Sequence, residues 1–133
     1  MIHLYTDGAS AGDPGVSGAG IVIVQNDGHV SEHRYHLGEM TNHEAEFAAL
    51  NIALSLCLDK GFKHVSARTD SKLVSDCIDK RYVKNKLFAT YLTEVLEKID
   101  AFELFFIKWV PSKQNKKADE LARLAIREPK RIY

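Results

Sequence analysis

Four acidic residues of the 133-residue chain stand where predicted strands end or predicted helices begin: Asp7, Glu46, Asp70 and Asp119. Carboxylate oxygens suit Mg²⁺ and Mn²⁺ better than they suit zinc. Several carboxylates in one cleft repel each other, so a fold keeps such a cluster when cations neutralise it. Two divalent ions about 4 Å apart can activate a water molecule and stabilise the departing oxygen of a phosphodiester. Gathered at one point, these residues could therefore support metal-dependent phosphodiester hydrolysis.

Each of these residues also has a structural explanation that needs no metal. Asp7 precedes a glycine, as turn residues commonly do. Asp70 could be the N-cap of the helix that follows it. Glu46 and Asp119 could be solvent-facing residues favoured by the dipole near a helix N-terminus. For each residue taken alone, the structural explanation is preferred. Four acidic residues at predicted strand ends and helix starts together favour a shared site.

The first part of the chain predicts three successive antiparallel strands. Segment 2–6 alternates apolar and polar residues, segment 21–24 is a run of four β-branched residues, and segment 30–37 is expected to be the next strand. The last two are separated by Asn26-Asp27-Gly28, a strong hairpin signal. The glycine-rich stretch from Gly8 to Gly20 is predicted to be a turn rather than a strand.

The second part of the chain predicts helices alternating with two further strands. Thr41 and Glu44 form a possible capping box, and Gly61 ends the helix that it opens. We then expect a strand at 64–69, helices at 71–80 and 86–99, a strand at 104–110, and a helix from Asn115, as its N-cap, to 127. This order predicts an α/β fold with a mixed sheet and helices on both faces. If the first and fourth strands are neighbours, Asp7 and Asp70 meet at one edge.

The composition is that of a globular protein with one domain over residues 1–133 and no metal-binding cysteine motif. No apolar run reaches the roughly 20 residues needed to cross a membrane, and no leader is apparent, so a cytoplasmic location is expected. The sequence does not indicate an oligomeric state, and a monomer is the default expectation. Cys57 and Cys77 are expected to be buried free thiols. Residues 1–59 hold one basic and eight acidic residues, and residues 60–133 hold seventeen basic and ten acidic ones. This asymmetry fits an acidic site in a basic setting, and equally fits Lys-rich solvated helix faces.

Four short motifs, in order over nearly the whole chain, resemble ribonuclease H of type 1: Thr6-Asp7-Gly8-Ala9-Ser10, Thr41-Asn42-His43-Glu44-Ala45-Glu46, Thr69-Asp70-Ser71 and Asn115-Lys116-Lys117-Ala118-Asp119. The resemblance implies a ribonuclease H-like fold, a five-stranded sheet of order 3-2-1-4-5 with strand 2 antiparallel. It implies an endonuclease that hydrolyses the RNA strand of RNA–DNA hybrids. Two Mg²⁺ ions, or Mn²⁺ in their place, would be held by the four carboxylates named above.

The same resemblance implies a set of substrate-binding residues: Gly12, Asp13, Asn42, Ser71 and Lys113. Two of the chain's departures from the family bear on its activity. Asp13 replaces the asparagine of the family's G-N-P-G motif, and no histidine follows His64, although many members carry one before the final aspartate. These departures motivate an alternative, a ribonuclease H-fold module that binds hybrid or double-stranded RNA but cuts poorly. A DNA-directed nuclease is a third possibility.

Two further groups of residues have structural and functional interpretations. Four aromatic residues are expected in the core rather than on a base-stacking surface: Phe102, Phe105, Phe106 and Trp109. The basic cluster Lys80, Arg81, Lys84 and Lys86 is either a contact for the hybrid or an exposed connection between helices.

Overall fold

A five-stranded sheet with four α-helices makes up the computed structural model, which describes residues 1–128. The sheet order is β3-β2-β1-β4-β5. The strands are β1 (Ile2–Ser10), β2 (Gly15–Val24), β3 (Val30–Met40), β4 (His64–Thr69) and β5 (Leu104–Trp109). The helices are α1 (Asn42–Asp59), α2 (Lys72–Lys80), α3 (Lys86–Ile99) and α4 (Lys116–Arg127), with a short 3₁₀ turn, η1 (Ser112–Gln114), before α4.

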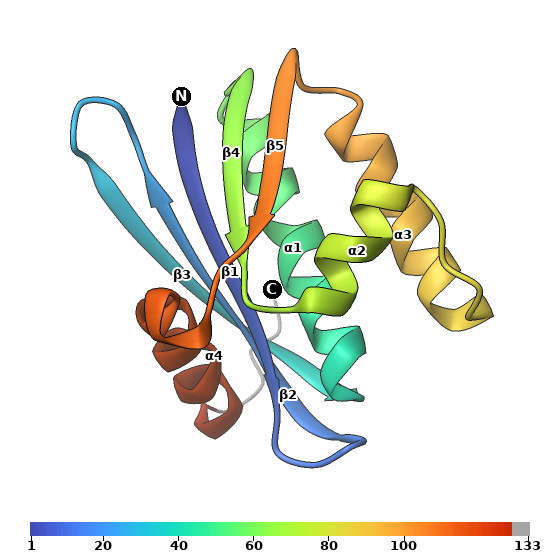
Figure 1. Cartoon of the computed structure of the whole chain (residues 1–133). Helices are drawn as coiled ribbons and strands as arrows, with labels where there is room; N and C mark the ends of the chain where they lie inside the picture. Colours follow the sequence, from blue (N-terminus) through green and yellow to red (C-terminus); the bar gives the residue numbers. More distant parts are fainter. Residues whose placement is uncertain (129–133) are drawn as a thin grey trace.

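The sheet is mixed. β2 runs antiparallel to both β1 and β3, whereas β1, β4 and β5 are parallel to one another. Helix α4 lies on one face, and α1, α2 and α3 lie on the other (Figure 1). The predicted α/β fold, strand order and helices on both faces are therefore confirmed. Strand β4 ends at Thr69, which is paired with Thr6 of β1, so Asp70 follows beside Asp7 near the centre of the sheet.

The prediction of a turn from Gly8 to Gly20 is wrong, because most of this stretch belongs to β1 and β2 and only residues 11–14 connect them. The glycines serve helix packing instead. A Cβ atom on Gly8 would overlap the backbone carbonyl group of Ala45 in α1, and one on Gly20 would overlap that of Ala118 in α4. Glycine at these positions lets the two helix backbones approach the sheet, one on each face.

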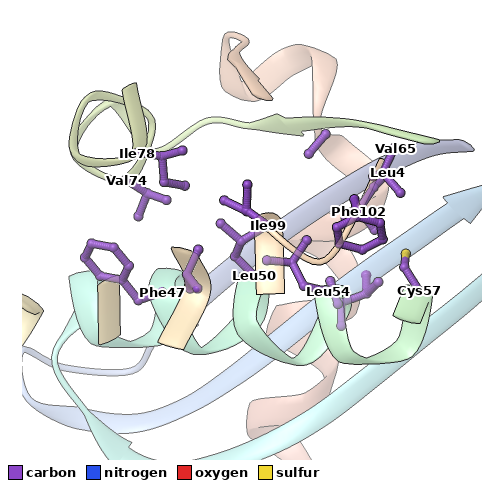
Figure 2. Packing of buried hydrophobic residues seen from close by; sticks show 14 of the residues in the cluster. Leu4, Phe47, Leu50, Leu54, Cys57, Val65, Val74, Ile78, Ile99 and Phe102 are labelled. Atoms are coloured by element: carbon purple, nitrogen blue, oxygen red, sulfur yellow. The ribbon is translucent and has the colours of Figure 1, made fainter. Parts of the chain in front are cut away.

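The main core lies between the sheet and helices α1, α2 and α3. In Figure 2, Phe47 of α1 lies toward Val74 and Ile78 of α2, whereas Leu54 of the same helix lies toward Leu4 of β1 and Phe102. Cys57 and Cys77 are free and buried, as predicted. Phe106 is 54% exposed, so its expected place in the core is wrong. Helix α1 is apolar on several sides because it packs against both the sheet and α3.

No helix among residues 1–128 combines the length and the apolar character needed to span a membrane.

A Gly20→Ala substitution should destabilise the protein by about 3 kcal/mol, because the methyl group would collide with the backbone of α4 and force the helix away from β2. Urea unfolding measures the loss. Gly28→Ala is the matched control. Gly28 has a φ of +88°, but no heavy atom of the described residues lies within 4 Å of the place its methyl group would take, so only about 1 kcal/mol of backbone strain is expected. Equal losses in the two variants would contradict the close approach of α4.

Candidate active site

The four carboxylates line one cleft of about 500 Å³ at the carboxyl edge of the central strands. Asp7 comes from β1, and Asp70 follows the end of β4. Glu46 lies in the second turn of α1, and Asp119 lies in the first turn of α4. The cleft lining is Asp7, Gly8, Ala9, Ser10, Ala11, Asn42, Glu46, Asp70, Ser112, Asp119, Arg123, Ile126 and Arg127. Segments from the whole length of the chain thus meet at one acidic point.

Asp7 is the most constrained of the four. Its residue is only 7% exposed, and it lies inside β1 between β2 and β4 rather than in a turn. Burial, followed by the nearby Asp70 and hydrogen bonding to Asp119, raises the pKa of the Asp7 carboxyl to about 9. The Asp7 carboxyl therefore binds a proton more tightly than an ordinary carboxyl does, at the point where the other acidic side chains gather.

Asp70 is not the N-cap of the helix that follows it. Ser71 holds that position, and its Oγ accepts a hydrogen bond from the backbone N–H of Val74 at 3.2 Å. The Asp70 backbone is fixed from the other side, because the indole Nε1–H of Trp109 donates to its carbonyl oxygen at 3.1 Å. The carboxylate of Asp70 is therefore not used for capping and is available to the cleft. Trp109 itself is 47% exposed, so its predicted place in the core is wrong.

Glu46 is held by polar neighbours on its own helix. The Asn42 side-chain Nδ2–H donates to Glu46 Oε1 at 3.3 Å, and His43 Nδ1 lies 3.4 Å from Oε2. Burial raises the pKa of Glu46, while hydrogen bonds from Ser71 and His43 oppose that rise. The capping box formed by Thr41 and Glu44, which the sequence predicted, fixes the start of this helix. The position of Glu46 thus follows from the way α1 begins.

Asp119 points into the cleft from α4 and is paired with an arginine. Arg123 Nε donates to both carboxylate oxygens of Asp119, at 3.1 and 3.0 Å. Asn115 takes the N-cap position of α4, as predicted, but its side chain makes no capping hydrogen bond. Its Nδ2–H instead donates to the carbonyl oxygen of Thr6 at 2.8 Å. That bond ties α4 to the strand residue next to Asp7.

The donor set of the cleft fits hard divalent cations. Its carboxylates are all oxygen donors, and the high pKa of Asp7 reflects a crowding of anions that a divalent cation would relieve. Among residues 1–128, no three histidine, cysteine or acidic side chains are already arranged as a metal-binding group. Asp119 is turned to Arg123, and Glu46 is bonded to Asn42.

The predicted substrate-binding residues lie in different places around the cleft. Asn42 lines it. Gly12 and Asp13 lie in the exposed loop 11–14, and Asp13 is bonded to the backbone of Asn42. Ser71 is buried beneath the floor, and Lys113 is exposed in η1.

Sequence reasoning missed two basic residues of the cleft, Arg123 and Arg127. They follow Asp119 by four and eight positions, a spacing that puts all three on one side of α4. This spacing was the signal that could have found them.

Sequence comparisons relate the chain to known proteins over nearly its full length. A family model described as "Reverse transcriptase-like" matches residues 5–125. The chain is 39% identical over 130 residues to the protein EbsB of Enterococcus faecalis, and the alignment covers 96% of each protein. It is 35% identical over 127 residues to the ribonuclease HI of Halobacterium salinarum, and this alignment covers 94% of the chain and 64% of that protein.

Solved structures agree with this relationship. Ribonuclease H1 from Halobacterium salinarum superposes with a TM-score of 0.91 at 34% identity, covering 96% of this chain and 98% of that one. LC11-RNase H1, solved in complex with an RNA/DNA hybrid, gives a TM-score of 0.88 at 30% identity and covers 96% and 97%. The chain therefore belongs to the ribonuclease H family. Within that family it is similar to the type 1 enzymes, and it is a ribonuclease H.

Replacing Asp7 by Asn should change how stability depends on pH. Because the pKa of Asp7 is raised from its usual 3.8 to about 9, the folded state binds this proton more tightly, and stability is lost as pH rises between these values. Asn has no such proton. In EDTA, Asp7→Asn should gain about 2 kcal/mol or more over the wild type on going from pH 4 to pH 8, measured by urea unfolding.

Asp76→Asn is the control for this comparison, because it makes the same charge change at an exposed position of α2. Its stability should follow that of the wild type. If the Asp7→Asn and wild-type curves ran parallel from pH 4 to pH 8, Asp7 would not carry the proton assigned to it.

Proposed function

We propose that this ribonuclease H hydrolyses the RNA strand of RNA–DNA hybrids with the help of two divalent ions. The observation that carries the proposal is the crowding of Asp7, Asp70 and Asp119, with burial, that raises the pKa of Asp7 to about 9. A cleft built in this way favours cations over any neutral ligand. Similarity to LC11-RNase H1, whose complex contains an RNA/DNA hybrid, supports the substrate.

The metal ligands in this proposal are Asp7, Glu46, Asp70 and Asp119. Mg²⁺ is the expected ion, and Mn²⁺ is expected to replace it, because both prefer carboxylate oxygens. When bound, the ions would supply an activated water molecule and stabilise the departing oxygen. Asp7, buried between two strands, provides the fixed centre of the ligand set. Asn42 and His43 orient Glu46 through its two carboxylate oxygens.

The substrate contacts in this proposal lie on the rim of the cleft. Gly12, Asp13 and Asn42 would flank the RNA strand, whose 2′-hydroxyls distinguish it from DNA. Ser71 is buried and would act on the site through its hydrogen bond to Glu46. Lys113, exposed in η1, would contact a phosphate on the other side. The basic cluster at residues 80–86 is an exposed connection between α2 and α3, and we assign it to the DNA backbone.

Replacing Asp70 by Asn should abolish cleavage, by about a thousandfold or more, while the protein stays folded, because a neutral amide is a much poorer ligand for a divalent ion. The assay is cleavage of a hybrid labelled on its RNA strand, with Mg²⁺, with Mn²⁺ and with EDTA. Asp76→Asn on α2 is the control, because it makes the same change of size and charge at an exposed position, and it should retain activity. Metal-dependent cleavage by Asp70→Asn at the wild-type rate would refute the proposal.

A substrate panel separates the proposed function from its alternatives. We expect Mg²⁺-dependent cutting of the RNA strand in a hybrid, and no comparable cutting of duplex DNA, duplex RNA or single-stranded RNA. Preferred cutting of duplex DNA would favour a DNA-directed nuclease. Tight binding of the hybrid in a gel-shift assay, without cleavage in either metal, would favour the binding module.

A further inference from the structure

The loop between β1 and β2 is folded back onto the start of α1. Ser10 Oγ lies within hydrogen-bond distance of the carbonyl oxygens of Gly12 and Met40, the latter at 3.0 Å. Ser17 Oγ lies 2.9 Å from the carbonyl oxygen of Gly15 and 3.3 Å from that of Met40. Within the loop, the Ala11 N–H donates to the carbonyl oxygen of Val16 at 2.8 Å. The base of the loop is therefore anchored two residues before α1 begins.

Asp13 makes the contact between the tip of this loop and the helix. Its Oδ1 accepts a hydrogen bond from the backbone N–H of Asn42 at 3.1 Å. Asn42 is the first residue of α1, so its N–H has no partner within the helix. The side chain of the same Asn42 donates to Glu46 Oε1 at 3.3 Å. Asp13 is thus linked to a proposed metal ligand through a single residue.

The contact with Asn42 needs an oxygen acceptor at position 13 but does not need a charge. The side-chain oxygen of asparagine, the residue of the family's G-N-P-G motif, could accept the same hydrogen bond. Aspartate adds a negative charge on an exposed loop beside the cleft that Asn42 lines. A nucleic-acid strand in this groove brings phosphate charges of the same sign, so the added charge weakens binding in a salt-dependent way.

We propose that Asp13 is a positioning residue with two separable effects: its oxygen holds the loop on Asn42 and so orients Glu46, while its charge lowers the affinity for the substrate strand. This inference rests on the proposed function for the identity of the substrate. The oxygen effect is a property of the protein alone and is present without substrate or metal.

Two substitutions separate these effects. Asp13→Asn keeps the acceptor and removes the charge, and it should lower KM for the hybrid about threefold to tenfold at low salt, with the difference shrinking as salt is raised. Asp13→Ala removes both the charge and the acceptor, so its KM should lie above that of Asp13→Asn at every salt concentration. Asp27→Asn is the matched control: Asp27 also accepts a backbone N–H, from His29, but in the turn at the opposite end of the sheet.

Amide hydrogen exchange at Asn42, measured by NMR without nucleic acid, reports the oxygen effect directly. Asn42 should be protected in the wild type and in Asp13→Asn, and should exchange about tenfold faster in Asp13→Ala. Equal exchange in all three proteins would overturn the positioning role, and equal KM for Asp13→Asn and the wild type at low salt would overturn the charge effect. If the wild type cut no hybrid at all, the proposed function would fail, while the exchange measurement would still decide the positioning role.

Discussion

The site depends on one unfavourable interaction, the burial of the Asp7 carboxyl beside other acidic side chains. The side chain is almost fully buried within β1, it has Asp70 and Asp119 as neighbours, and its pKa is raised to about 9. Water cannot stabilise a carboxylate in such a place, and the neighbouring acids oppose it further. Only a proton or a cation can compensate the crowded charges. Whether a proton or a cation compensates this charge affects both the stability of the protein and its proposed metal-dependent reaction.

The packing of the helices on the sheet determines whether this crowding occurs. Helix α4 can bring Asp119 to Asp7 because Gly20 lets the helix backbone lie directly on β2. Helix α1 approaches the opposite face at Gly8 in the same way and carries Glu46 with it. The side chain of Asn115 then ties the start of α4 to Thr6, next to Asp7. Glycines that resemble turn residues in the sequence are thus the means by which two helices reach one site.

Much of the site could be predicted from the sequence because strand ends and helix starts have local signals. The end of β4 located Asp70, and the alternating residues of the first strand placed Asp7 on it, although β1 continues past Asp7 to Ser10. The Thr41–Glu44 capping box located the helix that carries Glu46. Features that depend on contacts between distant segments were not predictable. The exposure of Trp109 and the bond from Asn115 to Thr6 both belong to this kind. The β-strand propensities of single residues also could not show that the stretch from Gly8 to Gly20 belongs to β1 and β2, because its conformation depends on the helices packed against it.

The most direct test of the account is an NMR titration of the Asp7 side-chain carboxyl carbon, with and without Mg²⁺. Without the ion, the titration should give a pKa of about 9. With saturating Mg²⁺, the apparent pKa should fall below neutrality, because the cation takes over the compensation that the proton provided. An ordinary pKa in the absence of metal, or a raised pKa that Mg²⁺ leaves unchanged, would contradict the claim that this cleft is built for divalent cations.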